Sequence, residues 1–157
     1  MTLLLHKQAP DFSLTSTSSH MFHLSKDFRD KACILFFYSR NFNTSCTQEV
    51  CGFRDEFTLL QKLGVAVIGI SRDDIVTHIQ FKNKYDLPFE LLSDIEGEVS
   101  KKYQALFPWI GVSKRVTYLL NRQHSIVAVY ESLFNSKKHI QYMLEKLKAP
   151  QSAILTT

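Results

Sequence analysis

Two cysteines five residues apart, Cys46 and Cys51, are the residues of this chain best suited to do chemistry. They follow a near-continuous apolar run at residues 32–38 and a short polar turn. This pattern predicts a buried strand, a loop and a helix that begins near Thr44 or Ser45. Cys46 would then lie in the first helical turn, where unpaired backbone N–H groups and the helix dipole favour a negative charge. Because the thiolate is the nucleophilic and oxidisable form of cysteine, this position predicts a reactive Cys46.

The spacing of the two cysteines limits how they can react with each other. Five residues along a helix correspond to a rise of about 7.5 Å and an angle of about 140° between the side chains. That rise exceeds the usual Cα–Cα span of a disulfide, so Cys46 and Cys51 could pair only if the first helical turns unwind. A zinc site is disfavoured, because no histidine lies nearby at ligand spacing. The Cys-x-x-Cys motif of thiol–disulfide oxidoreductases is also absent from the sequence.

The third cysteine, Cys33, lies inside the apolar run and is predicted to fill core space, as free cysteines often do. An odd number of cysteines, together with an N-terminus that does not read as an export signal, favours free thiols in the cytoplasm. We expect no membrane span, since no window approaches about 20 apolar residues.

Length and composition predict one globular domain. The chain has 157 residues, of which 45% are hydrophobic and 22% charged, as in an ordinary soluble protein. We expect a single domain over residues 1–150 and a frayed tail at 151–157. The formal net charge of +4 is spread thinly along the chain, which favours a solvated basic surface over a nucleic-acid site.

The order of hydrophobic segments predicts an α/β three-layer sandwich of the thioredoxin type. It would have an N-terminal β-hairpin and a central mixed sheet with helices on both faces. The expected strands are 9–14, 21–24, 32–38, 65–70, 89–92, 115–120 and 125–130, and the expected longer helices are 44–63, 71–85, 96–103 and 136–147.

Short segments spread over residues 8–147 share one further pattern. They are Ala9-Pro-Asp-Phe12, Phe37-Tyr38, Cys46-Thr-Gln-Glu-Val-Cys51, Phe53-Arg-Asp55, Gly69-Ile-Ser71, Lys84-Tyr-Asp-Leu-Pro-Phe89, Leu92-Ser-Asp94 and Tyr103. Together these segments resemble the peroxiredoxins, and most nearly the bacterioferritin comigratory protein (peroxiredoxin Q) branch of the AhpC/TSA family. The resemblance implies a thiol-dependent peroxidase that reduces hydrogen peroxide and organic hydroperoxides without a cofactor or metal ion.

The resemblance also implies roles for the two cysteines. Cys46 matches the peroxidatic cysteine, which attacks a peroxide oxygen and becomes a sulfenic acid. Cys51 matches the resolving cysteine, which condenses with that sulfenic acid to an intramolecular disulfide. Thioredoxin or a similar dithiol would then reduce the disulfide. Since an internal resolving cysteine removes the chemical need for a second subunit, we expect a monomer.

Two charged residues match further positions of the family's active site. Arg115 matches the arginine that holds the thiolate and polarises the peroxide, whereas the sequence without this resemblance favours a surface arginine on a strand. Glu49 matches an acidic residue that fixes an arginine. A glutamate placed near the helix start to favour the dipole explains Glu49 nearly as well.

Two positions depart from the family pattern Pro-x-x-x-Thr-x-x-Cys. Ser39 stands at the proline position and Asn43 at the threonine position. Asn43 has both a donor and an acceptor, so it could replace the threonine toward the peroxide with a longer side chain. Loss of the proline removes a rigid apolar shield over the sulfur. Because a displacement of about 1 Å can cost about 100-fold in rate, we expect a weaker peroxidase than a full-motif relative.

A degenerate peroxiredoxin fold that serves as a redox sensor or binding module is the alternative hypothesis. Ser39, Asn43 and the bulky apolar segment 107–110 motivate it, since exposed apolar residues can mark a partner surface. The other interpretation of segment 107–110, which we favour, is a loop packed over the active-site side of the domain.

Overall fold

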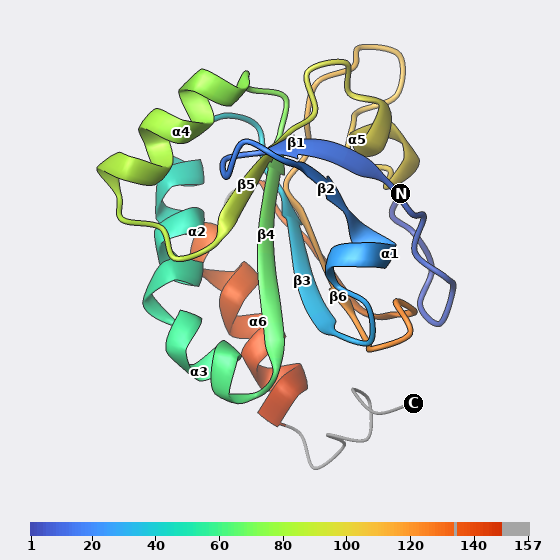
Figure 1. Cartoon of the computed structure of the whole chain (residues 1–157). Helices are drawn as coiled ribbons and strands as arrows, with labels where there is room; N and C mark the ends of the chain where they lie inside the picture. The colour runs from blue at the N-terminus through green and yellow to red at the C-terminus, as the bar shows by residue number, and fades with distance from the viewer. Residues whose placement is uncertain (134, 149–157) are drawn as a thin grey trace.

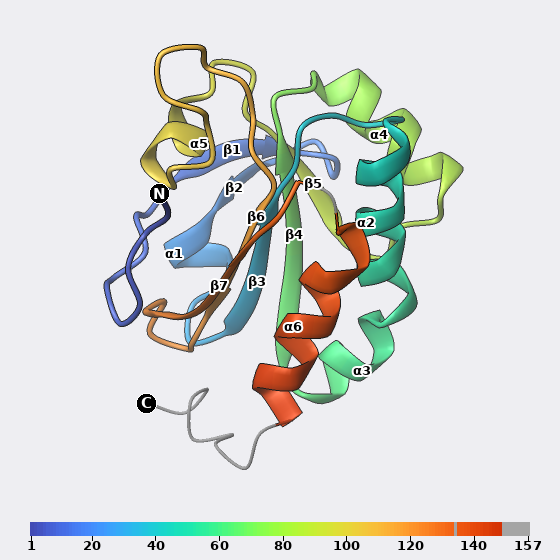
Figure 2. The ribbon, with the colours of Figure 1, turned by 180° about the vertical axis from the view of Figure 1, so that it is seen from behind.

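The computed structural model describes residues 1–133 and 135–148 of the chain (Figure 1, Figure 2). The tail predicted at residues 151–157 lies outside the described residues, so the domain boundary at residue 150 stays a prediction. Within the described ranges, no helix is long and apolar enough to cross a bilayer. In chain order the elements are β1 (Ser13–Ser16), β2 (Met21–His23), α1 (Leu24–Asp27), β3 (Ala32–Phe37), α2 (Thr44–Asp55), α3 (Phe57–Lys62), β4 (Val65–Ser71), α4 (Ile75–Lys84), β5 (Glu90–Ser93), α5 (Glu98–Lys102), β6 (Val116–Leu120), β7 (Ile126–Glu131) and α6 (Ser136–Lys148).

A single mixed sheet forms the middle layer of the molecule. Its seven strands lie in the order β2-β1-β5-β4-β3-β6-β7. β4 runs parallel to β3 and to β5, and all other neighbours are antiparallel. Helices α2, α3, α4 and α6 cover one face of the sheet, and α1 and α5 cover the other (Figure 1, Figure 2). The predicted thioredoxin-like sandwich with its N-terminal hairpin is therefore confirmed.

Strand β3 runs through the centre of the sheet and separates two apolar cores. All six of its residues are buried, and successive side chains point to opposite faces. Ile34 and Phe36 pack with α2, α3, α4 and α6, whereas Leu35 and Phe37 pack on the side of α1 and α5. Cys33 belongs to the second core and is 0% exposed, which confirms the prediction that it fills core space. Burial raises the pKa of its thiol far above the ordinary value, so Cys33 is held as an unreactive thiol.

Two predicted elements differ in extent from those observed. The first strand is expected to begin at residue 9, but β1 begins at Ser13 because the preceding residues bond to the β6–β7 turn, with Ala9 N–H donating to His124 O at 2.9 Å. The helix expected to run to Gly64 is interrupted at Glu56, whose φ of −100° and ψ of 6° lie outside the α-helical region. The apolar stripe continues across the interruption, so periodicity alone could not locate it.

Candidate active site

Cys46 lies in the first turn of α2, as the sequence predicts. The helix begins at Thr44, and the preceding Asn43 is its N-cap residue, with Oδ1 accepting a hydrogen bond from Cys46 N–H at 3.3 Å. The Cys46 side chain is 0% exposed and packs in the core between α2 and β3. Its sulfur therefore combines burial with proximity to the positive end of a 12-residue helix.

The side-chain hydrogen bond to the Cys46 sulfur comes from Ser39, which lies two residues after β3. Ser39 Oγ is 3.1 Å from Cys46 Sγ. In the sequence Ser39 stands out only as a departure from the family pattern, and this contact was not predicted. A hydroxyl in the loop before a helix cap gives no sequence signal of where it points.

A buried polar network fixes the loop that carries Ser39. Tyr38 Oη donates to Asn41 Oδ1 at 2.6 Å, and Asn41 N–H donates to Asp73 Oδ2 at 2.9 Å. Asn41 Nδ2 lies 3.0 Å from His78 Nδ1, so the amide donates and the imidazole accepts. Burial lowers the pKa of His78, which agrees with the neutral ring that this hydrogen bond requires.

Arg115 is buried directly before β6, so the interpretation as a surface arginine is wrong. Its Nε donates to Glu49 Oε2 at 2.9 Å, and Nη1 donates to Leu133 O at 3.0 Å. The remaining nitrogen, Nη2, is buried and has no hydrogen-bond partner among the described residues. A buried guanidinium with an unpaired Nη2 group can donate a hydrogen bond to an additional oxygen atom.

Glu49 holds Arg115 from the second turn of α2. Its side chain is 0% exposed, and the first turn of α2 has no acidic residue, so the alternative role as a first-turn glutamate is wrong. Cys46 and Glu49 are three residues apart and so lie on one face of the helix. The Glu49–Arg115 ion pair therefore joins Arg115 to the face of α2 that also carries Cys46. Burial raises the pKa of the Glu49 carboxyl to about 8, with Arg115 opposing the shift.

His139 of α6 completes the group around Glu49 and was not predicted. Its Nδ1 lies 2.8 Å from Thr117 Oγ1 and 3.6 Å from Glu49 Oε1, while Nε2 lies 3.0 Å from Ser132 O. Because a carbonyl only accepts, Nε2 carries the proton and Nδ1 accepts from Thr117. Burial lowers the pKa of His139 to about 4, so the ring is neutral near neutral pH. The sequence places His139 on the apolar face of the last helix. That position indicates a buried side chain, but it does not identify Glu49 as its contact.

Cys51 lies in the same intact helix as Cys46 but in different surroundings. It is half-buried, and all three cysteines of the chain are free thiols. Burial raises the pKa of the Cys51 thiol, partly opposed by Arg54. Five residues of regular helix separate the two Cα atoms axially by about 7.5 Å, so the predicted need for unwinding applies to this structure.

In the segment 107–110, Phe107 is half-buried but the three residues after it are exposed, so the expectation that the segment packs over the active-site side is wrong. Trp109 is 102% exposed and Ile110 is 70% exposed. Trp109 and Gly111 have φ values of 74° and 65°, so the backbone at the loop tip is left-handed at both residues. Arg72 Nη1 donates to Gly111 O at 3.0 Å and ties the loop to the body of the domain. The segment is an exposed apolar surface of this molecule.

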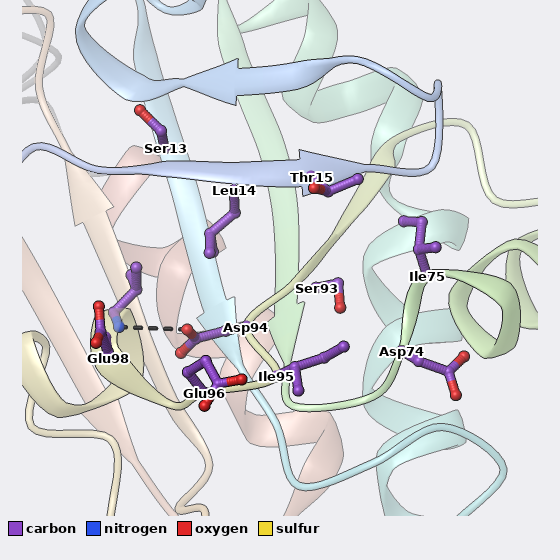
Figure 3. Close-up of a pocket in the computed structure, with 11 residues that line it drawn as sticks. Ser13, Leu14, Thr15, Asp74, Ile75, Ser93, Asp94, Ile95, Glu96 and Glu98 are labelled. Atoms are coloured by element: carbon purple, nitrogen blue, oxygen red, sulfur yellow. Dashed lines mark hydrogen bonds between the residues drawn. The ribbon is translucent and has the colours of Figure 1, made fainter.

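A hollow of about 350 Å³ between β1, α4 and α5 carries several carboxylates but no cysteine (Figure 3). The Asp94 carboxylate is already hydrogen-bonded to α5, because it accepts hydrogen bonds from Val99 N–H at 3.3 Å and Ser100 N–H at 2.7 Å. Nowhere in the described ranges do three or more His, Cys, Asp or Glu side chains form a group that could hold a metal ion. The hollow is separate from the Cys46 site.

Comparison with known proteins agrees with this fold. Residues 5–129 match the model of the AhpC/TSA family. A peroxiredoxin bcp from Coxiella burnetii is 38% identical over 136 residues, which cover 83% of this chain and 89% of that protein. The chloroplastic peroxiredoxin Q of rice (Oryza sativa subsp. japonica) is 36% identical over 142 residues, covering 90% of this chain. The matched region spans only 65% of the rice protein.

Comparison with solved structures also identifies peroxiredoxins. The crystal structure of peroxidoxin BcpB from Mycobacterium tuberculosis matches with a TM-score of 0.87 and 26% identity, covering 93% of this chain and 97% of that chain. A cysteine-to-serine mutant of PrxQ from Xylella fastidiosa matches with a TM-score of 0.80 and 25% identity, covering 95% of this chain and 94% of that chain. The chain belongs to the AhpC/TSA family of peroxiredoxins, a family of thiol-dependent peroxidases. Within that family it falls in the bacterioferritin comigratory protein, or peroxiredoxin Q, branch.

Proposed function

We propose that this chain reduces hydrogen peroxide and organic hydroperoxides through Cys46. The observation that supports this most is the buried Cys46 at the capped N-terminus of α2, with a buried arginine paired to Glu49 about one helical turn further along. The thiolate sulfur attacks one peroxide oxygen, an S–O bond forms and the O–O bond breaks. The electron pair of the O–O bond stays on the leaving oxygen, which takes a proton to give water or an alcohol. Cys46 is thereby oxidised to a sulfenic acid.

Arg115 and Asn43 are the residues we assign to the peroxide. The unpartnered Nη2 of Arg115 can donate to a peroxide oxygen and stabilise the charge that develops on it. Asn43 uses Oδ1 to cap α2, which leaves its amide N–H groups available as donors. Glu49 positions Arg115. Since Asn43 is longer than the family's threonine, we expect turnover below that of a full-motif relative.

Cys51 is the residue we assign to resolve the sulfenic acid. The first turns of α2 unwind and the Cys51 thiolate attacks the Cys46 sulfur. An S–S bond forms, the S–O bond of the sulfenic acid breaks, and the leaving hydroxide takes a proton to give water. Thioredoxin or a similar dithiol then reduces the disulfide by thiol–disulfide exchange and is itself oxidised. We further propose that the protein acts as a monomer in the cytoplasm, because the cycle needs one chain and free thiols persist in a reducing compartment.

Thioredoxin-coupled peroxide consumption by three variants tests the proposal. Cys46→Ser is expected to abolish both thiol oxidation and turnover. Cys51→Ser is expected to retain the first oxidation of Cys46 but to lose disulfide-dependent turnover. Cys33→Ala, which removes the buried thiol of β3, serves as the matched control and should retain turnover. Full turnover by Cys46→Ser would end the proposal.

A redox sensor or binding module is the second candidate, and the exposed Trp109 and Ile110 favour it. The variant Asn43→Thr separates the two functions. It restores the family's residue beside Cys46, so it should raise the rate of peroxide consumption if the chain is an impaired enzyme. A binding module would show no such gain.

A further inference from the structure

We infer that Ser39 is a further catalytic residue: its hydroxyl donates a hydrogen bond to the Cys46 thiolate and steadies the sulfur through the attack on peroxide. This inference rests on the proposed peroxidase function and adds a reacting-site contact that the family pattern does not contain. The residue touches the reacting atom itself, since Ser39 Oγ lies 3.1 Å from Cys46 Sγ.

The direction of this hydrogen bond follows from the state of the sulfur. A thiol can donate or accept, but a thiolate has no proton and only accepts. In the reactive state the Ser39 hydroxyl must therefore be the donor. Cys46 is 0% exposed, so water is excluded from the side chain and the Ser39 donor has little competition. A hydrogen bond to an ionised acceptor is also stronger than one between neutral groups.

The backbone on both sides of Ser39 is fixed before any peroxide arrives. Tyr38 N–H donates to Ile70 O of β4 at 3.1 Å. Asn41 N–H donates to Asp73 Oδ2 at 2.9 Å, and its side chain joins the buried network with His78. A hydroxyl held between two such anchors is already in place to donate to the thiolate when the peroxide arrives.

Serine at position 39 therefore gives the sulfur a hydrogen-bond donor in place of the apolar cover that the family's proline would provide. A proline at this position would cover the sulfur with an apolar ring but would have no hydroxyl to donate. During the attack, negative charge leaves the sulfur as the S–O bond forms, and the peroxide is reduced as the O–O bond breaks. After the attack, the same hydroxyl can bond to the sulfenic acid that results.

Alkylation of Cys46 by iodoacetamide tests the hydrogen bond independently of peroxide. In a Cys51→Ser background, Ser39→Ala should lower the Cys46 alkylation rate about tenfold, because the attacking thiolate loses its side-chain hydrogen-bond donor. Ser39→Thr keeps the hydroxyl and should restore most of the rate. Ser45→Ala is the matched control, because Ser45 is a half-buried neighbour of Cys46 with no side-chain hydrogen bond among the described residues.

The outcomes separate the hydrogen bond from simple packing. Removal of the Ser39 hydroxyl opens space beside the sulfur, so an effect of access alone would raise the rate rather than lower it. An unchanged or raised rate in Ser39→Ala, or a loss that Ser39→Thr does not restore, would overturn the inference. If alkylation depends on Ser39 as expected but the wild type consumes no peroxide, the proposed peroxidase function fails while the hydrogen bond stands.

Discussion

Cys46 and Cys51 lie on one helix, but the two thiols meet opposite conditions. Cys46 is fully buried at the capped end, with Ser39 Oγ 3.1 Å from its sulfur and the Glu49–Arg115 pair one turn away. Cys51 is half-buried in the helix interior, where burial raises the pKa of its thiol. The same residue type thus has two different surroundings five residues apart. The comparison indicates that reactivity comes from the side chains gathered around the first turn of α2 rather than from the cysteines themselves.

The helix that prepares Cys46 also keeps Cys51 away from it. The N-cap bond from Asn43 and the ion pair from Glu49 both need the first two turns of α2 to be intact. A disulfide between the two cysteines needs those turns to open. The proposed cycle therefore alternates between an intact helix for peroxide attack and an unwound helix for resolution.

The largest expected effect is on the oxidation of Cys46 when the Arg115 guanidinium is removed. Arg115→Gln is expected to slow the oxidation of Cys46 by peroxide about 100-fold or more, as when an oxyanion donor is lost. Rapid mixing with peroxide followed by thiol trapping and mass spectrometry measures that rate. Arg122→Gln, at an exposed arginine that donates to Asp30 O, is the control and should react normally. A loss below about threefold would show that Arg115 is only structural.

The buried histidine beside Glu49 should make the fold sensitive to acid. Burial lowers the pKa of His139 from 6.5 in the unfolded chain to about 4 in the folded one. The unfolded chain therefore binds more protons in this window, and stability is lost as the pH falls from 6.5 toward 4. From this residue we expect a loss of about 3 kcal/mol in the free energy of unfolding. Urea unfolding at a series of pH values measures it.

The variant His139→Gln should flatten that acid dependence, whereas His20→Gln at an exposed histidine should not. Equal acid dependence in the wild type and His139→Gln would contradict the buried arrangement of the histidine against Glu49.

The smallest expected effect is on the rate at which Cys51 forms the disulfide. Gly52→Ala adds a methyl group whose nearest contact is Ile140 Cγ2 at 3.4 Å, and alanine favours an intact helix by up to about 1 kcal/mol over glycine. Unwinding should become harder, so the rate of disulfide formation after peroxide addition should fall about fourfold. The rate of the first oxidation of Cys46 should not change. Disulfide formation at the wild-type rate would argue that resolution does not require the helix to open.

Much of the Cys46 side of the site could be predicted from the sequence because its signals are local. An apolar strand, a polar turn and a helix start are short-range patterns, and they place Cys46 in the first helical turn and Cys33 in the core. The start of α2 at Thr44 agrees with the expectation to within one residue.

Contacts between distant elements could not be predicted in the same way. His139 reaches Glu49 from a helix 90 residues further along the chain, and no periodicity encodes that distance. The bulky segment 107–110 is expected to be packed because apolar residues favour burial. Its loop tip instead has left-handed backbone conformations at Trp109 and Gly111, and Trp109 is exposed to solvent.

Mass spectrometry of the wild type after one equivalent of peroxide tests the central claim most directly. A non-reducing digest should contain a peptide pair linked through Cys46 and Cys51, in a chain that has lost two hydrogens and has not dimerised. Thioredoxin should return it to the free-thiol form. A chain that keeps both thiols, or that links two copies through Cys46, would contradict the account.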